Sequence, residues 1–273
     1  YYYLMIAEGG TGPDHSVTVA RSRQIGGPYE GNPDNPILTH RHLGKNYPVV
    51  YVGHGDLVEA ADGSWYMVML ASRREQGFTL MGRETFLAKV VWENGWPVVN
   101  PGIGKLEEHI ELPMEEYPFE PKDTVYHFWQ DRLPMDFVML RNPAKNLYSL
   151  TERQGWLRLR LRTETLRDEA GPAYLGVRQR HFSWQASALL DFCPEQEEEA
   201  AGLALVQSNG YHLRFEKVRN ERGTPCIRIR RCENGADQKI AVAEVLDGVC
   251  VLRMVCHGLN VDLYYEQNGV KHC

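Results

Sequence analysis

Four short stretches of the sequence place glycine beside side chains that could do chemistry. They are Ala7-Glu8-Gly9-Gly10-Thr11, Gly53-His54-Gly55-Asp56, Gly82-Arg83-Glu84-Thr85 and Asn94-Gly95-Trp96-Pro97-Val98. The glycines on either side of His54 leave little crowding, so its imidazole could approach a ligand or a metal ion, although a structurally satisfied histidine is the more common case. Gly9-Gly10 and Asn94-Gly95 could be plain turns. Arg83 with Glu84 could be a surface ion pair, which contributes little to stability.

Short predicted strands separated by turn residues must position these stretches. Apolar or alternating runs cover residues 1–7, 15–22, 55–59, 64–72 and 85–92. Asp62-Gly63, between two of these runs, is a strong hairpin signal. No helical periodicity is evident, and strands about ten residues apart with Gly and Pro turns predict a barrel, a sandwich or a propeller.

The rest of the chain changes character twice. Residues 101–122 are rich in Pro and Glu, which indicates a connection between domains. Residues 123–273 return to strands, among them Trp156–Arg162 with strictly alternating Leu and Arg, Tyr211–Lys217 and Cys226–Cys232. This pattern predicts an antiparallel β-sandwich.

Composition limits the classes of partner. The 273 residues are 43% hydrophobic and 24% charged, with a formal net charge of −6. This is globular, argues against a nucleic-acid partner and fits a neutral substrate such as a sugar. No apolar run reaches the roughly 18 residues that a membrane helix needs. The six cysteines contain no C-x-x-C pair, so a zinc site is not expected; we expect reduced thiols, with disulfides as the alternative.

In their order and spacing, the four stretches resemble glycoside hydrolase family 43 of the β-xylosidase and α-L-arabinofuranosidase type. The matching motifs are E-G-G-T-(x)₃-H-S-V-T-V-A-R-S, G-P-Y-E-x-N-P-x-N-P-I-L-T, G-H-G-D-L-V-E-x-x-D-G-x-W-Y, G-R-E-T-F and N-G-W-P-V. They cover nearly all of residues 1–105. Residues 123–273 look like the concanavalin A-like sandwich appended to many of these enzymes, with the softer motifs S-L-T-E-R-Q-G-W-L-R-L and A-G-L-A-L-V-Q-S-N-G-Y.

The resemblance implies an all-β protein in two domains. Residues 1–106 are expected to form the C-terminal blades of a partial five-bladed β-propeller, and residues 107–122 a linker. Residues 123–273 are expected to form an antiparallel β-sandwich of the concanavalin A-like type. We expect this sandwich to be truncated at its C-terminus, because the Gly/Phe-rich segment that related sandwiches lend to the propeller is not found before Cys273.

The resemblance also implies hydrolysis with inversion, by a general acid and a general base whose carboxyl groups lie about 6.5–9.5 Å apart. A third carboxylate tunes the pKa of the acid. The family pattern places all three before Tyr1, so no catalytic residue is assigned to this chain, and Glu8 is only a look-alike within E-G-G-T. We expect an inactive fragment of an inverting exo-glycosidase that removes terminal β-xylose or α-L-arabinofuranose from xylan-type oligosaccharides.

Three residues carry over from the family as lining the substrate pocket. Arg83 presents a planar fork of donors, which suits vicinal sugar hydroxyls and steadies a nearby carboxylate. His54 is expected near the propeller axis, and Thr11 at the lip of the pocket. No metal ligand is assigned, although the resemblance allows a divalent cation such as calcium near the axis, where His54 could approach it.

The implied partner is a xylo- or arabino-oligosaccharide substrate, with no nucleic acid and no membrane, and the resemblance leaves a homo-oligomer open. We expect a cytoplasmic protein, and secretion stays open because the N-terminus is missing. The alternative is a non-catalytic carbohydrate-binding or accessory β-sandwich protein, which an exposed row of aromatic side chains would favour. In a third, structural role, the sandwich would cap the propeller and help to form oligomers.

Overall fold

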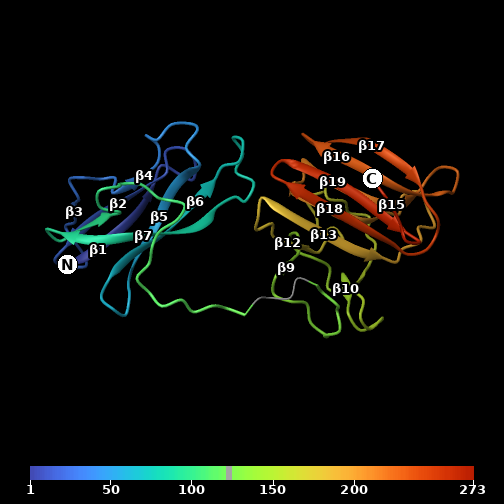
Figure 1. Ribbon diagram of the computed structural model, residues 1–273, viewed down its shortest axis with the longest axis horizontal. Helices are drawn as coiled ribbons and strands as arrows, with labels where there is room; N and C mark the ends of the chain where they lie inside the picture. The colour runs from blue at the N-terminus through green and yellow to red at the C-terminus, as the bar shows by residue number, and fades with distance from the viewer. Residues whose placement is uncertain (121–124) are drawn as a thin grey trace. The chain divides into compact units, whose positions relative to one another are not determined.

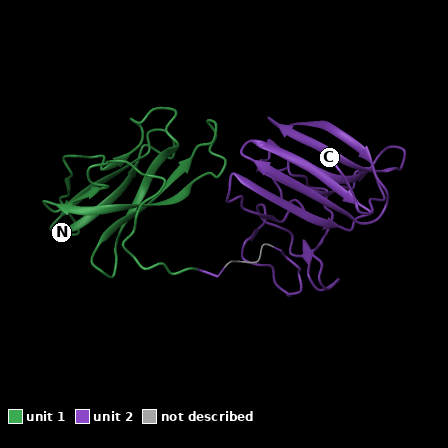
Figure 2. Ribbon diagram, viewed as in Figure 1, with its two compact units in different colours: residues 1–118 green, residues 119–273 purple. Residues whose placement is uncertain are grey.

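The computed structural model describes residues 1–120 and 125–273 and divides into two compact units, residues 1–118 and 119–273 (Figures 1 and 2). Every regular element assigned in these residues is a β-strand, so the all-β prediction is confirmed. In the described part of the chain, no helix is long and apolar enough to cross a membrane. The end of the predicted linker and the start of the predicted sandwich, residues 121–124, lie outside the described residues.

Unit 1 begins with a four-stranded sheet centred on β2. Its strands are β1 (Tyr2–Glu8), β2 (Ser16–Ser22), β3 (Glu30–Gly31) and β4 (Leu38–Thr39). β1 runs antiparallel to β2 along its whole length, and the two short strands pair with opposite ends of β2. Between them, the side-chain amide of Asn35 bonds to the backbone N–H and C=O of Val19, both at 2.9 Å. Together with the backbone N–H of Asn32, which also donates to the Val19 carbonyl at 2.9 Å, this side chain pairs the backbone groups of Val19 in the gap between β3 and β4.

The second sheet of unit 1 is an antiparallel meander. Its strands, in spatial order, are β5 (Val49–Glu59), β6 (Trp65–Arg73), β7 (Glu84–Glu93) and β8 (Trp96–Val99). The predicted hairpin at Asp62-Gly63 joins β5 to β6, and Gly63 has the positive φ of 83° that such turns favour. β5 is longer than the predicted strand at residues 55–59, because its first half is distorted and hides the alternation.

An apolar cluster fills the space between the two sheets of unit 1. Its buried members are Val17, Leu38, Val49, Val52, Met67, Met69, Ala71, Ala88, Val90, Val99 and Leu106. Leu106 lies beyond the last strand and is held by His40. The Leu106 N–H donates to Nε2 of His40 at 2.8 Å, and Nδ1 of His40 lies 2.7 Å from the carbonyl oxygen of Val49. Because Nε2 accepts, Nδ1 carries the proton and His40 is neutral.

Two four-stranded antiparallel sheets form the sandwich of unit 2. One contains β13 (Ser183–Leu190), β18 (Cys250–His257), β19 (Asn260–Gln267) and β20 (Val270–His272). The other contains β14 (Ala201–Ser208), β15 (Tyr211–Arg219), β16 (Pro225–Glu233) and β17 (Ala236–Glu244). Phe215 and Ile227 of the second sheet pack with Cys250, Leu252 and Met254 of the first, so the sheets lie face to face (Figure 1).

The alternating run Trp156–Arg162 does not form the long strand that its pattern predicts. Only Arg158–Leu159 is a strand (β11), paired with Tyr148–Ser149 (β10). Leu159 and Leu161 are 40% and 49% exposed, so the leucine side is not buried as the inner face of a sheet would be. The arginines pair with nearby carboxylates of Glu152 and Glu164. The alternation therefore reflects local ion pairing, not a sheet face. A second two-residue pair joins β9 (Phe137–Val138) and β12 (Gly176–Val177).

All six cysteines are free thiols. Cys226, Cys232, Cys250 and Cys256 are buried, and the other two are exposed. Burial raises the pKa of the Cys226, Cys250 and Cys256 thiols, which keeps them protonated and poorly reactive.

Candidate functional site

A distortion in β5 presents His54 to solvent. The register of β5 against β6 shifts twice, on either side of Gly53. A residue with positive φ lies in each irregular part, 60° at Tyr51 and 57° at His54. Such bulges turn a side chain out of the regular alternation of a strand. His54 is consequently exposed although Gly53 and Gly55 on either side of it are buried.

Close packing explains the two glycines that flank His54. A Cβ atom at Gly53 would lie 2.3 Å from both Cδ2 and Nε2 of His15. A Cβ atom at Gly55 would lie 2.6 Å from Sδ of Met67. Real Cβ atoms do not approach other heavy atoms so closely, so both positions need glycine for space. The motif Gly53-His54-Gly55 thus combines two close approaches with one outward-facing imidazole.

The side chain against Gly53 is His15, in the turn between β1 and β2. His15 is only 3% exposed. Its Nδ1 lies 3.1 Å from the backbone oxygen of Glu8. Its own backbone N–H donates to the carbonyl of Gly12 at 3.1 Å, and its carbonyl accepts from Oγ1 of Thr39 at 2.9 Å. The ring is therefore held in a fixed place beside β5.

Arg83 reaches the same ring from the turn between β6 and β7. Nη2 of Arg83 lies 3.2 Å from Nε2 of His15. A guanidinium can only donate, so Nε2 accepts and the proton of His15 is on Nδ1, where it donates to Glu8. Burial lowers the pKa of His15 most; the bond to Glu8 opposes this, and the charges of Arg83 and His54 lower the pKa further. His15 is therefore a neutral acceptor near pH 7.

Two of the three predicted pocket residues belong to segments that meet His15. Arg83 is bonded to His15, and His54 is close enough for its charge to act on the pKa of His15. Thr11 is exposed in the same β1–β2 turn as His15. Within residues 1–120, no hydrogen bond joins its side chain to His54 or Arg83. Sequence reasoning did not select His15, although it is the histidine of the motif E-G-G-T-(x)₃-H.

The acidic residues of the motifs stay outside this cluster. Glu84 accepts from Nε and Nη2 of Arg73 at 3.0 and 2.7 Å, so its carboxylate is taken by Arg73 and not by its sequence neighbour Arg83. Glu8 contributes its backbone oxygen, and Asp56 is exposed on β5. The cluster can donate hydrogen bonds to hydroxyls or to a carboxylate, but it holds no pair of carboxyl groups for acid–base hydrolysis.

A divalent cation does not fit these residues. The described residues contain no group of three or more His, Cys, Asp or Glu that could hold a metal ion. Calcium requires several oxygen ligands, whereas this cluster offers imidazole nitrogens beside the positive charge of Arg83.

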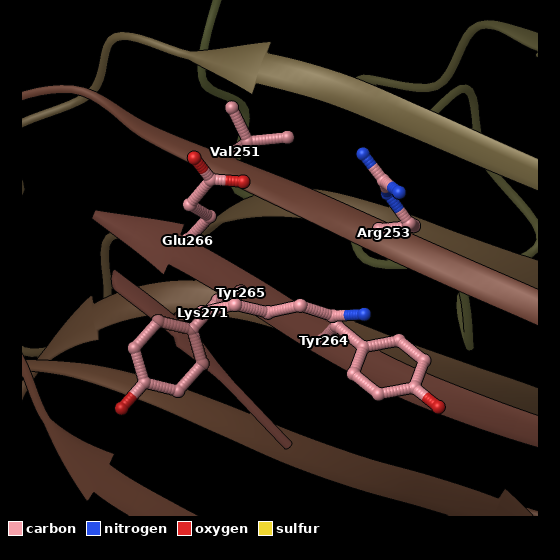
Figure 3. A pocket seen from close by; sticks show the side chains of 6 residues that line it. All are labelled: Val251, Arg253, Tyr264, Tyr265, Glu266 and Lys271. Carbon is pink, nitrogen blue, oxygen red and sulfur yellow. The ribbon is translucent and has the colours of Figure 1, made fainter. Parts of the chain in front are cut away.

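The residues His15, His54 and Arg83 line neither of two further concavities. One of about 350 Å³ in unit 1 is bounded by Arg73, Glu84, Phe86 and residues 107–110. The other, on the sheet of β18 and β19 in unit 2, holds about 10 Å³, roughly the space of one water molecule (Figure 3). There, Nζ of Lys271 lies 4.0 Å from the centre of the Tyr264 ring. Lys271 therefore covers the face of Tyr264 at this concavity.

The fold and the cluster define an all-β protein with hydrogen-bond donors gathered beside two adjacent sheets. Residues 1–97 match the family described as glycosyl hydrolases family 43, and residues 125–272 match the β-xylosidase C-terminal concanavalin A-like domain. The chain belongs to glycoside hydrolase family 43. Its fold is the predicted partial five-bladed β-propeller followed by a concanavalin A-like sandwich.

Named relatives and solved structures agree with this family. The chain is 41% identical to a xylosidase/arabinosidase of Butyrivibrio fibrisolvens over 99% of this chain and 53% of that protein. It is 39% identical to the non-reducing end α-L-arabinofuranosidase BoGH43B of Bacteroides ovatus over 78% of this chain and 40% of that protein. The structure superimposes on that of the Bacteroides ovatus xyloglucan PUL GH43B with a TM-score of 0.94 and 32% identity, over 100% of this chain and 54% of that one. A xylan β-1,4-xylosidase from Bacillus halodurans gives a TM-score of 0.92 at 30% identity, over 98% and 52%. The chain thus spans about half the length of the relatives it matches.

Proposed function

We propose that the protein containing this chain is an inverting exo-glycosidase that removes terminal β-xylose or α-L-arabinofuranose from xylan-type oligosaccharides. The observation that carries this proposal is that Arg83 bonds to His15 while Gly53, next to His54, packs against the same ring, in a chain of glycoside hydrolase family 43. The names of the relatives, a xylosidase/arabinosidase and an arabinofuranosidase among them, support this substrate class.

In this proposal the cluster binds and orients the sugar. The exposed guanidinium of Arg83 donates to adjacent hydroxyls of the terminal sugar or to a catalytic carboxylate. The imidazole of His54 contributes a second polar contact, and Thr11 lies at the rim. We assign no catalytic carboxylate to residues 1–273. The relatives are about twice as long, which leaves room for these groups in the rest of the protein.

The test uses the full-length protein that contains this chain. Initial rates are measured on 4-nitrophenyl β-D-xyloside and 4-nitrophenyl α-L-arabinofuranoside. Arg83→Ala should lower kcat/KM by about 10–100-fold, since charge-assisted hydrogen bonds contribute roughly 1.5–3 kcal/mol. The matched control is Arg41→Ala, because Arg41 is exposed in the same unit and bonds only locally to His42.

Two results would contradict the proposal. One is a folded full-length protein that releases nitrophenol from neither substrate. The other is an Arg83→Ala variant whose kcat/KM equals that of the Arg41→Ala control.

A further inference from the structure

His15 is not among the residues proposed to contact the sugar, yet it bonds to Arg83 and packs against Gly53. We infer that His15 is a positioning residue, whose neutral Nδ1–H form accepts an N–H of Arg83 at Nε2 and so fixes the guanidinium for the substrate. This inference rests on the proposed function, because it assumes that Arg83 contacts the sugar.

The first step is that His15 cannot adjust its position. The ring is 3% exposed, and Nδ1 is bonded to the backbone of Glu8 at 3.1 Å. Its other side lies against Gly53, where the space does not admit even a methyl group. An acceptor held in this way determines the direction from which a donor must approach.

The second step is that Arg83 needs such an acceptor. It follows Gly82, which has φ of 68°, in a turn where Arg83 itself is exposed. The neighbouring carboxylate of Glu84 is held by Arg73 through two nitrogens. The bond to Nε2 of His15 at 3.2 Å restrains the guanidinium instead. Preorganising a binding side chain lowers the entropy lost when the ligand binds.

The third step is that only one form of the ring performs this role. With the proton on Nδ1, His15 donates to Glu8 and accepts from Arg83. The other neutral form, and the protonated ring, would direct an N–H at the N–H of Arg83. Burial and the nearby charges of Arg83 and His54 lower the pKa of His15, which agrees with a neutral ring.

Variants of the full-length protein separate the two bonds of His15. In His15→Asn, the side-chain amide can still donate to Glu8 but offers no acceptor at the position of Nε2. In His15→Gln, the longer side chain can place its oxygen there. We expect KM to rise about tenfold or more in His15→Asn, with kcat changed less, and to recover to within about threefold in His15→Gln.

A double-mutant cycle shows whether His15 acts through Arg83. In an Arg83→Ala background, His15→Asn should change KM by less than about twofold. An equal rise of KM in both backgrounds, or no rise in the wild-type background, overturns the inference. His42→Asn serves as the control, since His42 is exposed in the same unit.

A spectroscopic measurement remains informative if His15→Asn does not fold or if the protein hydrolyses neither substrate. In full-length protein with ¹⁵N-labelled histidine, the His15 resonances are identified by their loss in His15→Gln. Nδ1 should be protonated and Nε2 unprotonated at pH 7. A proton on Nε2 overturns the inference whatever the activity, whereas a missing activity with the expected form contradicts only the proposed function.

Discussion

Gly53→Ala tests the contact on which the geometry of the cluster depends. The new Cβ would lie 2.3 Å from Cδ2 and Nε2 of His15 and 2.6 Å from Cγ. The φ of Gly53 is not in the left-handed region, so the backbone itself accepts alanine. The perturbation is therefore steric: either the ring of His15 moves or β5 does.

The expected loss of stability combines three effects. Overpacking a buried site costs about 1–3 kcal/mol. A shifted ring loses a hydrogen bond to Glu8 or Arg83, at a cost of about 0.5–1.5 kcal/mol. Replacing glycine by alanine restricts the unfolded chain and returns about 0.4–1 kcal/mol. The sum predicts that Gly53→Ala lowers the free energy of unfolding by about 2 kcal/mol.

Urea unfolding of the full-length protein, followed by tryptophan fluorescence, measures this difference. The matched control is Gly12→Ala, because a Cβ at Gly12 meets no atom within 4 Å and Gly12 has no left-handed φ. Repeating Gly53→Ala in a His15→Ala background should abolish most of the loss, since the clashing ring is gone. A Gly53→Ala variant as stable as the control, or a loss that persists without the ring, would refute the reasoning.

Two further predictions concern buried polar side chains, one in each unit. Burial lowers the pKa of His40 below its ordinary value near 6.5, so the unfolded chain takes up a proton more readily than the folded one. The contribution of His40 to the free energy of unfolding should be fully present above about pH 6.5 and should decrease as the pH falls from there to the pKa of the folded state. In urea titrations at pH 7 and pH 5, His40→Gln should reduce this decrease, whereas His42→Gln should leave it unchanged. In unit 2, Glu216→Gln should cost about 3 kcal/mol, because this 5% exposed carboxylate holds Arg228 at 2.8 Å. The control is the exposed ion pair of Glu233 with Arg231, where Glu233→Gln should cost less than about 0.5 kcal/mol. Equal losses of stability for Glu216→Gln and Glu233→Gln in thermal unfolding would contradict the account.

The alternation of apolar and polar residues in the sequence predicted strands that the structure contains. β15 and β16 lie within two residues of the predicted runs 211–217 and 226–232, although burial does not alternate along β15, where the four consecutive residues 215–218 are all buried. The same rule was wrong at residues 156–162, where ion pairs to acidic neighbours, not burial, produce the alternation. No strand was predicted from the sequence at β17, because this edge strand is exposed on both faces and its residues do not alternate between polar and apolar.

The site was only partly accessible from sequence. His54 and Arg83 were selected because their motifs resemble a family. In the structure Arg83 bonds to His15, and His54 follows Gly53, which packs against the same ring. The role of His15 could not be predicted, since it depends on Gly53 and on Arg83, which is 68 residues away in sequence. The sequence does not reveal that Gly53 packs against a buried ring, because a glycine in a turn would look the same.

The most direct measurement is a crystal structure of the full-length protein soaked with xylose or arabinose. The account predicts a terminal sugar whose hydroxyls lie about 2.7–3.2 Å from the guanidinium of Arg83 and the imidazole of His54, with Arg83 still bonded to Nε2 of His15. A sugar bound away from both side chains, or Arg83 and His54 on opposite faces of the blades, would contradict it.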